Sequence, residues 1–503
     1  MAEQSKRLPN VGTVGDFDMK LSKFRRAAFG MGLLTCSPIL VAEAQEKQNA
    51  DAVALPSDAE IRQMLAQRVE AIAGNEDGIG IVVGVIGPQG RRIISYGHAK
   101  RGDTRALDGD TVFEIGSVTK VFTALLLADM VQKGELALGD PVAKYLPAGV
   151  KIPERKGRSI TLLDLATHTS GLPFMHDEAV ASNGSSAGKN SSAQLFESVS
   201  RVRLAHDIGS AWDYSNLGYW LLAQTLTHRS GEDYQSLLRT RILAPLKLTS
   251  TAVVTPSLKL ELAVGHDAEL QPTQAWYAIP MYSEMQAAGG LASTANDLLT
   301  FLAANMGYER SPLASAMNSM LNTRRPTGRP CEAQALGWLV IGEGDDLLIV
   351  HDGGTWGSAS SLAWDPKNRI GVVALSNQVA GVDDISRHLL RPAMPLRKPA
   401  STKHTEITLA PDVLNKYTGK YRAEGEGVFI IARERDFLTF QAPPDWGLPK
   451  LRIRPESLHD FFASELPLRV TLETDSEGRV TGLLIHPPRG QRAVPAKRLD
   501  SEH

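Results

Sequence analysis

The stretch EIGSVTKVFTALLLADMVQKGELALGD, residues 114–140, contains a long apolar run that opens on a charged residue. Residues 121–131 are almost wholly apolar, which predicts a helix buried on nearly every side. Lys120 stands at the front of that helix, three residues after Ser117. Residues at this spacing lie on one face of a helical turn, so we expect the two side chains to lie together.

A serine and a lysine in this arrangement suit a nucleophile and its base. Amide groups at a helix start favour negative charge, which stabilises an alkoxide-like serine oxygen. Loss of hydration disfavours the ammonium form of a lysine, which suits a group that takes a proton. The alternative is a serine that caps the helix and a lysine whose ammonium group reaches water. Because S-x-x-K occurs often by chance, the spacing alone leaves both interpretations open.

A second candidate segment is AWDYSNLGYWLLAQ, residues 211–224. It places Tyr214 and Asn216 just ahead of an apolar helical run. A phenol at this point can relay protons, and an asparagine can bind an amide of a substrate. The alternative is a polar loop that caps the helix.

A third candidate segment is IVHDGGTWGSASSLAW, residues 349–364. It places His351, Gly353 and Gly354 at the end of a predicted strand. Glycines let a ligand approach the backbone closely, and the edge of a strand can pair with a peptide-like ligand. The alternative is a simple tight turn.

The composition is that of a globular protein without a polyanionic partner. The 503 residues are 43% hydrophobic and 22% charged, and the formal net charge of −2 argues against binding to nucleic acid or to an anionic membrane surface. No apolar run reaches about 18 residues, so we expect no membrane-spanning helix. The two cysteines are Cys36 and Cys331. If the N-terminal segment is removed, no intrachain disulfide can form, and the fold must depend on core burial.

The N-terminal region, residues 1–44, has the pattern of an export signal, with a possible true start at Met19. A basic stretch at 20–26 is followed by an apolar run and by an A-x-A cleavage pattern at 42–44. The pattern predicts an exported protein, either periplasmic or secreted. The alternative is a disordered tail.

The order of the predicted elements indicates one main domain over residues 57–395. A capped helix near 58–72 precedes two strands within 80–97, residues 117–306 look mainly helical, and strand patterns return over 336–378. Strands at both ends with helices between them predict a sheet assembled from distant segments, in an α/β or α+β fold.

The C-terminal part has a different character. Residues 396–408 fall in a stretch with proline and lysine that is typical of a linker. Short alternating strands over 409–503 then predict a small all-β domain.

Taken together, the three candidate segments resemble the serine β-lactamase and penicillin-binding-protein superfamily, with Tyr-Ser-Asn in the place of the class C Tyr-x-Asn motif. Flanking phrases that match are VFEIGSVTKVFTALLLADMVQKGEL (112–136), LLDLATHTSGLP (162–173) and AAGGLASTANDLLTFL (287–302). The resemblance covers about residues 60–400. It implies an antiparallel sheet flanked by helices, with a helical region inserted between its early and late strands.

The resemblance also implies a role for each matching residue. Ser117 would be the acylated nucleophile, Lys120 would share in its deprotonation, and Tyr214 would act as general base and acid. Asn216 would bind the substrate amide. The backbone N–H groups of Ser117 and Gly354 would form an oxyanion hole, in which each donor contributes about 3 kcal/mol.

The third motif departs from the class C pattern, because His351-Asp352-Gly353 replaces Lys-Thr-Gly. A histidine is mostly neutral near pH 7, so it binds a substrate carboxylate less strongly than a lysine does. Asp352 adds a negative charge nearby. A histidine here resembles the D-aminopeptidase-type peptidases of the superfamily.

The resemblance therefore implies a hydrolase that acts through an acyl-enzyme, with short or D-residue-containing peptides as the leading substrates. The alternatives on the same scaffold are an esterase and a class C-like β-lactamase. An alternative of another class is a non-catalytic protein that binds penicillin or peptidoglycan. No cofactor is implied, and the histidines at 168, 176 and 206 match no zinc spacing.

Overall fold

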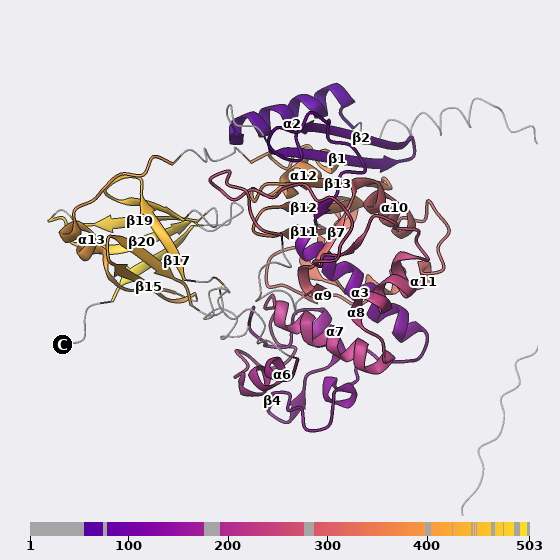
Figure 1. Cartoon of the computed structure of the whole chain (residues 1–503). Helices are drawn as coiled ribbons and strands as arrows, with labels where there is room; N and C mark the ends of the chain where they lie inside the picture. The colour runs from indigo at the N-terminus through magenta and orange to yellow at the C-terminus, as the bar shows by residue number, and fades with distance from the viewer. Residues whose placement is uncertain are drawn as a thin grey trace, which may run out of the picture. The chain divides into compact units, whose positions relative to one another are not determined.

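The structure is a computed structural model (Figure 1). The residues that it describes include every candidate catalytic and substrate-binding residue. They are residues 55–73, 78–175, 192–275, 286–397, 404–424, 426–443, 446, 448, 450–463, 468–475, 477–486 and 493–499. The predicted export segment 1–44, including Met19, lies outside the described residues, as do His176 and most of the polar loop at 181–194.

An eight-stranded antiparallel sheet with the order β2-β1-β13-β12-β11-β10-β9-β8 forms the centre of the larger part of the chain (Figure 1). β1 lies between β2, which follows it in sequence, and β13 from the far end of the domain. Gly87 pairs with Gly90 across the turn between β1 and β2, as the sequence predicted. The strand bounds are β1 Gly80–Gly87, β2 Gly90–Gly97, β8 Arg325–Pro326, β9 Glu332–Gln334, β10 Leu339–Ile341, β11 Leu348–Gly354, β12 Ala359–Asp365 and β13 Ile370–Ser376.

Both faces of this sheet are buried, which explains why β1 and β13 are apolar along almost their whole length. In β1, Val82 and Ile86 belong to one core, whereas Val83 and Val85 belong to the other. Helices α2 (Asp58–Ala73) and α12 (Asp383–Leu390) cover one face, and α10 (Ala295–Asn305) covers the other.

Helix α2 begins with the predicted capping box. The side chain of Glu60 accepts the Ser57 backbone N–H at 2.7 Å, and the Ser57 hydroxyl accepts the Glu60 N–H at 3.3 Å. These two bonds satisfy amide groups that would otherwise lack partners at the start of α2.

The region between the early and late strands is mainly helical, as predicted, and α3 (Thr119–Gln132) lies at its centre. Every residue of 119–130 is buried, and Phe122 stacks on Phe301 with ring centroids 4.5 Å apart. The other helices there are α4 Leu162–Ala166, α6 Ser192–Arg201, α7 Asn216–Ser230, α8 Tyr234–Leu238, α9 Gln286–Gly289 and α11 Ala314–Met320. The short turns η1 Gly116–Val118, η2 Val142–Tyr145 and η3 Arg239–Leu243 join them, with the short strands β3 Phe113–Glu114, β4 Glu154–Arg155, β5 Arg158–Ser159, β6 Ala252–Val253 and β7 Leu291–Ser293.

No helix within the described ranges has the length and apolar character that a bilayer crossing requires.

The C-terminal part is a closed antiparallel barrel, so the prediction of a small all-β fold is confirmed. Each strand pairs with the next, and β21 pairs back with β14. Aromatic side chains, including Tyr421, Phe429, Phe440 and Phe461, fill its core. Its elements are α13 Pro411–Tyr417, β14 Gly419–Ala423, β15 Gly427–Glu434, β16 Phe437–Gln441, β17 Leu451–Pro455, β18 Asp460–Ala463, β19 Arg469–Thr474, β20 Val480–His486 and β21 Val494–Arg498.

Candidate active site

Ser117 and Lys120 lie together at the start of α3. The Lys120 ammonium group donates a hydrogen bond to Ser117 Oγ at 3.2 Å. Ser117 belongs to the short 3₁₀ turn η1, whereas the sequence suggested the first turn of the α-helix itself. The turn forms because Gly116 adopts a φ of +48°, in the left-handed region that favours glycine.

The ammonium group of Lys120 is held from three sides. Lys120 is completely buried, and besides Ser117 Oγ it donates to Asn216 Oδ1 at 2.7 Å and to the Ala288 carbonyl oxygen at 2.6 Å. All three acceptors are oxygen atoms, which suits an ammonium group that can only donate hydrogen bonds. Lys120 is thus not the snorkelling surface lysine of the alternative interpretation.

Tyr214 and Asn216 reach the same point from the start of α7. Ser215 caps this helix through its hydroxyl, which accepts the Gly218 N–H at 2.8 Å. Asn216 is the first residue of the helix, and the Lys120 Nζ atom lies 4.9 Å from the centroid of the Tyr214 ring. The structure therefore brings both residues to the serine–lysine pair, although the chain separates them from it by about 95 residues.

The third motif lies on a strand edge beside Ser117. β10 pairs with β11 only over residues 348–350, whereas β12 pairs with β11 as far as Gly354. Residues 351–354 therefore have a strand partner on one side only within the described part of the sheet. A strand edge with a strand partner on one side only is suited to pairing with an extended ligand.

The turn η1 packs against the face of the sheet at the end of β11. A Cβ atom added at Gly353 would lie 2.0 Å from the Ile115 carbonyl oxygen, and one added at Gly116 would lie 2.5 Å from the Gly354 nitrogen. The Ser360 hydroxyl of the neighbouring strand donates to the same Ile115 oxygen at 2.7 Å. Glycine is required where two backbones approach this closely, and the contact holds the Ser117 turn against β11.

His351 is almost fully buried, with 5% of its surface exposed. Its Nδ1–H donates to the Asp352 carbonyl oxygen at 2.8 Å, because a carbonyl oxygen can only accept. This bond fixes the orientation of the ring.

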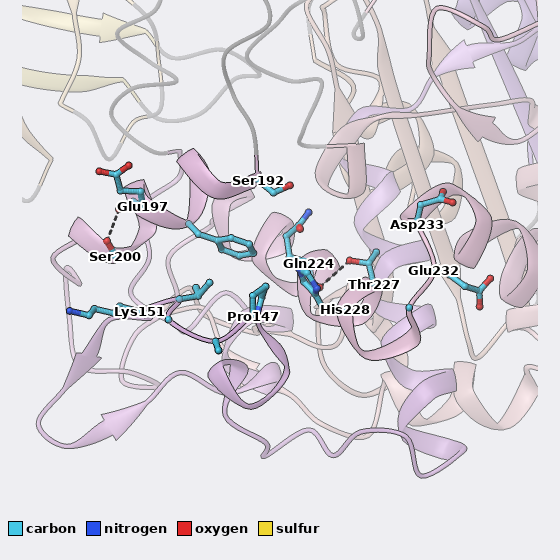
Figure 2. A pocket seen from close by; sticks show the side chains of 15 residues that line it. Pro147, Lys151, Ser192, Glu197, Ser200, Gln224, Thr227, His228, Glu232 and Asp233 are labelled. Carbon is cyan, nitrogen blue, oxygen red and sulfur yellow. Dashed lines mark hydrogen bonds between the residues drawn. The ribbon is translucent and has the colours of Figure 1, made fainter.

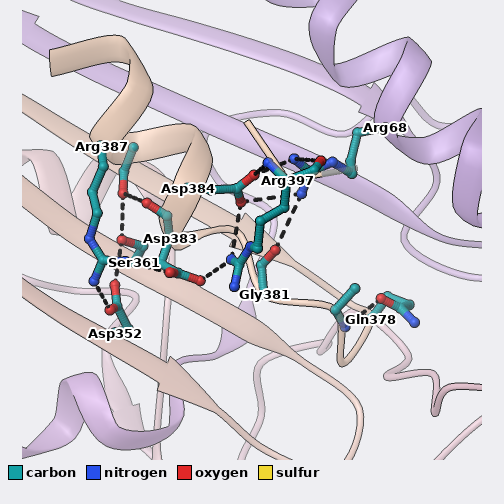
Figure 3. A network of polar contacts seen from close by, with 11 residues as sticks. Arg68, Asp352, Ser361, Gln378, Gly381, Asp383, Asp384, Arg387 and Arg397 are labelled. Carbon is teal, nitrogen blue, oxygen red and sulfur yellow. Dashed lines mark hydrogen bonds and ion pairs between the residues drawn. The ribbon is translucent and has the colours of Figure 1, made fainter. Parts of the chain in front are cut away.

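Asp352 points towards Arg387 of α12 (Figure 3), on the face of the sheet opposite to the one that Gly353 turns towards Ile115. It accepts a hydrogen bond from Ser361 at 2.8 Å and forms an ion pair with Arg387 of α12. Burial lowers the pKa of Arg387, but Asp352 and Asp383 outweigh that effect and keep its pKa above the usual value. The expectation of an added negative charge beside His351 is therefore wrong, because strand alternation turns the carboxylate towards a cation.

The ion pair is part of a larger network between α2 and α12 (Figure 3). Asp384 pairs with Arg68 at 2.5 Å and with Arg397 at 3.1 Å. Burial disfavours the charged form of Asp384, yet the hydrogen bonds from Arg68 outweigh it and lower the pKa of this carboxyl group. The network ties the helices behind the sheet to the strand that carries the third motif.

His168 also belongs to this site. The sequence places it in the matching phrase LLDLATHTSGLP and in no zinc pattern, and it predicted no catalytic role for this residue. It follows α4, has 1% of its surface exposed, and stacks on the Tyr214 ring with centroids 4.3 Å apart. In the described part of the chain, no group of three or more His, Cys, Asp or Glu side chains is arranged to hold a metal ion. The phrase Thr-His-Thr-Ser-Gly was the signal that could have identified it.

A separate hollow of about 1030 Å³ lies among α6, the end of α7 and the segment at 147–151 (Figure 2). Phe196, Glu197, Gln224 and His228 are among its lining residues. None of the predicted site residues lines it, so it is distinct from the site around Ser117.

Comparison with known proteins identifies the family. The family model described as Beta-lactamase matches residues 61–392. The chain belongs to the Beta-lactamase family. This family consists of serine hydrolases that include β-lactamases and DD-peptidases, so the protein is placed among the hydrolases.

Two relatives illustrate the range of the family. The chain is 28% identical over 335 residues to the D-alanyl-D-alanine-carboxypeptidase/endopeptidase AmpH of Escherichia coli K12, a match that covers 62% of this chain and 84% of AmpH. It is 26% identical over 353 residues to a β-lactamase of Pseudomonas fluorescens, covering 63% of this chain and 94% of that protein.

Solved structures agree on the fold. A class C β-lactamase from Rhodobacter sphaeroides matches with a TM-score of 0.55 and 26% identity, over 66% of this chain and 99% of that one. The crystal structure of SurE matches with a TM-score of 0.56 and 23% identity, over 88% of this chain and 99% of SurE. The SurE match shows that the likeness in fold extends beyond the family region.

Proposed function

We propose that this protein is an exported serine hydrolase that cleaves short or D-residue-containing peptides through an acyl-enzyme. The observation that carries the proposal is the position of the Lys120 ammonium group, which contacts Ser117 Oγ at 3.2 Å and Asn216 Oδ1 at 2.7 Å and lies near the Tyr214 ring. A nucleophile, a cation and a phenol held together in this way supply the groups that acyl transfer needs.

The proton of Ser117 goes to Tyr214 in this mechanism. Lys120 donates to Ser117, Asn216 and Ala288, and in this mechanism it acts as a cation that favours the phenolate form of Tyr214. Ser117 Oγ then forms a bond to the substrate carbonyl carbon, and the phenol passes the proton to the leaving amine as the C–N bond breaks. Water afterwards releases the acyl group from Ser117 by the same proton route.

The backbone N–H groups of Ser117 and Gly354 stabilise the oxyanion of each tetrahedral intermediate in this scheme. Support comes from the contact between η1 and the end of β11, which brings the two segments together. Asn216 uses its oxygen for Lys120, so its amide nitrogen is the end that binds a substrate carbonyl.

Peptides lead as substrates for two reasons. AmpH, the relative that acts on D-alanyl-D-alanine, matches over 84% of its own length. The third motif also carries His351 in place of a permanent cation, which favours substrates that do not depend on a strongly bound carboxylate. Export is supported by the signal-like pattern at 1–44 alone.

A β-lactamase is the second candidate, favoured by the Pseudomonas fluorescens relative and by the 26% identity to a class C enzyme of known structure. An esterase on the same scaffold comes next. A non-catalytic binder is the alternative of another class, and it would be acylated once without turnover.

The first experiment tests the nucleophile. A fluorophosphonate or a labelled penicillin should add its mass to the peptide that contains Ser117, and Ser117→Ala should abolish both the label and turnover. Label on another residue, or turnover that survives in Ser117→Ala, would refute the proposed mechanism.

The second experiment tests the proton path and the substrate. Lys120→Ala and Tyr214→Phe should each lower kcat by about 10²–10⁴-fold, the usual contribution of acid–base catalysis. Lys133→Ala, at an exposed position, and Tyr308→Phe, at a half-buried position outside the site, are matched controls and should retain activity. D- and L-peptide amides, p-nitrophenyl esters and a chromogenic cephalosporin, compared by kcat/KM, then separate the candidates, and a single burst without turnover would identify a binder.

A further inference from the structure

His168 makes three separate contacts with the segment that carries Tyr214. Its imidazole ring stacks on the phenol ring with centroids 4.3 Å apart and an interplanar angle of 27°. Its Nδ1 atom accepts the Ser215 N–H at 3.0 Å, and its carbonyl oxygen accepts the Asp213 N–H at 2.7 Å. One residue thus holds the ring of Tyr214 and the backbone on both sides of it.

The hydrogen bond to Ser215 fixes the protonation state of the imidazole ring. Nδ1 can accept an N–H only through its lone pair, so the ring proton must lie on Nε2. Burial, with the nearby Lys120 and His351, lowers the pKa of His168 well below its usual value, in agreement with a neutral ring. Nε2 has no hydrogen-bond partner among the described residues, so stacking and the Nδ1 bond hold the ring.

The backbone at His168 is in an uncommon conformation. Its φ is +56°, in the left-handed region that residues other than glycine adopt rarely. Residues held in such regions persist where the surroundings determine them, and they cluster at functional sites. Here the conformation allows the carbonyl oxygen and the ring of the same residue to face the Tyr214 segment.

We propose that His168 is the positioning residue for Tyr214: its neutral ring and its carbonyl oxygen lock the phenol in the orientation in which it exchanges a proton with Ser117. His168 does not itself gain or lose a proton in this step. The inference rests on the proposed function, because it assigns His168 a purpose only if Tyr214 carries the proton.

Two substitutions separate the contacts of the ring. His168→Phe keeps an aromatic ring for stacking but removes the acceptor for Ser215. His168→Asn keeps a side-chain acceptor and tolerates the positive φ, but it removes the stacking ring. Each should lower kcat about tenfold with little change in KM, and His168→Ala, which loses both contacts, should lower it about a hundredfold, as expected for a catalytic group displaced by about 1 Å.

A double-mutant cycle with Tyr214→Phe distinguishes positioning from a general structural role. In the Tyr214→Phe background, the His168 substitutions should lower kcat by less than about threefold, because no phenolic proton remains to be positioned. His228→Ala, on the exposed side of α7, is the control and should have no effect in either background. Rates are measured with an activated p-nitrophenyl ester, and reaction of Ser117 with a fluorophosphonate counts the folded sites.

The inference is overturned if the His168 substitutions lower kcat by the same factor in the wild-type and Tyr214→Phe backgrounds. It is also overturned if they raise KM and leave kcat unchanged. If His168→Ala does not fold, the double-mutant cycle is measured with His168→Asn and His168→Phe instead. Failure of the proposed function has a different signature, because turnover would then survive in Ser117→Ala whatever residue occupies position 168.

Discussion

Replacing Gly353 by alanine introduces a methyl group where two backbones meet. The added Cβ atom would lie 2.0 Å from the Ile115 carbonyl oxygen and 2.3 Å from the Ser360 hydroxyl. Carbon–oxygen contacts become ordinary near 3.4 Å, so the turn that follows Ile115 must move away from β11 by about 1.4 Å. That turn carries Ser117, and its displacement separates the serine amide from the amide of Gly354.

The size of the effect follows from this displacement. Displacing a catalytic group by about 1 Å lowers the reaction rate by about 10²-fold. Removing one hydrogen-bond donor from an oxyanion hole lowers kcat by about 10²–10³-fold. We therefore expect Gly353→Ala to lower kcat by at least about a hundredfold, or about 2.7 kcal/mol of barrier. Overpacking should also destabilise the fold by about 1–3 kcal/mol.

The assay is steady-state hydrolysis of the best substrate from the panel, with thermal unfolding measured on the same samples. Gly87→Ala is the matched control, because its Cβ atom would meet only the Ile370 side chain, at 3.6 Å. A Gly353→Ala enzyme with wild-type kcat and an unchanged Tm would show that η1 and β11 are not in tight contact, and the argument for their joint role would be refuted.

Three further predictions concern stability. Asp384→Asn should lower the free energy of unfolding by about 3–5 kcal/mol, because it breaks the buried ion pair with Arg68. Folding lowers the pKa of Asp384. The stabilisation from this carboxylate is therefore complete above its unfolded pKa of about 4, and it is lost as the pH falls through the lower folded pKa. The Asp384→Asn variant should accordingly lose less stability on acidification than the wild type does. Asn377→Ala should lower the free energy of unfolding by about 2–4 kcal/mol, because the oxygen and the nitrogen of this buried amide lie within hydrogen-bonding distance of five backbone groups. Cys331→Ser should change the free energy of unfolding by less than about 0.5 kcal/mol, because the thiol is exposed and forms no disulfide.

Urea unfolding curves at several pH values measure all three variants. Asp346→Asn removes a carboxylate whose side chain is 88% exposed, and it serves as the control for loss of charge. An Asp384→Asn protein with wild-type stability at pH 7, or an acid response parallel to that of the wild type, would contradict the importance of the buried pair. A cost below about 1 kcal/mol for Asn377→Ala would contradict its role as a hub of backbone contacts.

The parts of the fold that the sequence predicted well are those with a strong local signal. The apolar run at 121–131 gave the buried helix α3, and the alternation around Gly87 and Gly90 gave the β1–β2 hairpin. Local patterns do not specify which distant strands pair, and the order of the eight-stranded sheet therefore had to come from the structure. Closure of the barrel, in which β21 returns to β14, was equally invisible to local patterns.

The candidate site shows the same division. The residue types at 117, 120, 214 and 216 could be selected from motifs, and the structure brings all four together. The direction of the Asp352 side chain depends on its position within a strand and on a helix about 35 residues later, which motif reading does not include. His168 was overlooked for a similar reason, because its contacts run through backbone groups of a segment more than 40 residues away.

The pairing of β1 with β13 has a consequence for synthesis of the chain. About 290 residues separate the two strands, and ribosomes add about 5–20 residues per second, so the first strand waits about 15–60 s for its neighbour. During that interval the edge of β1 that later pairs with β13 is unsatisfied and open to other nascent chains. Soluble yield should therefore depend on elongation speed and on chaperones that shield such an edge.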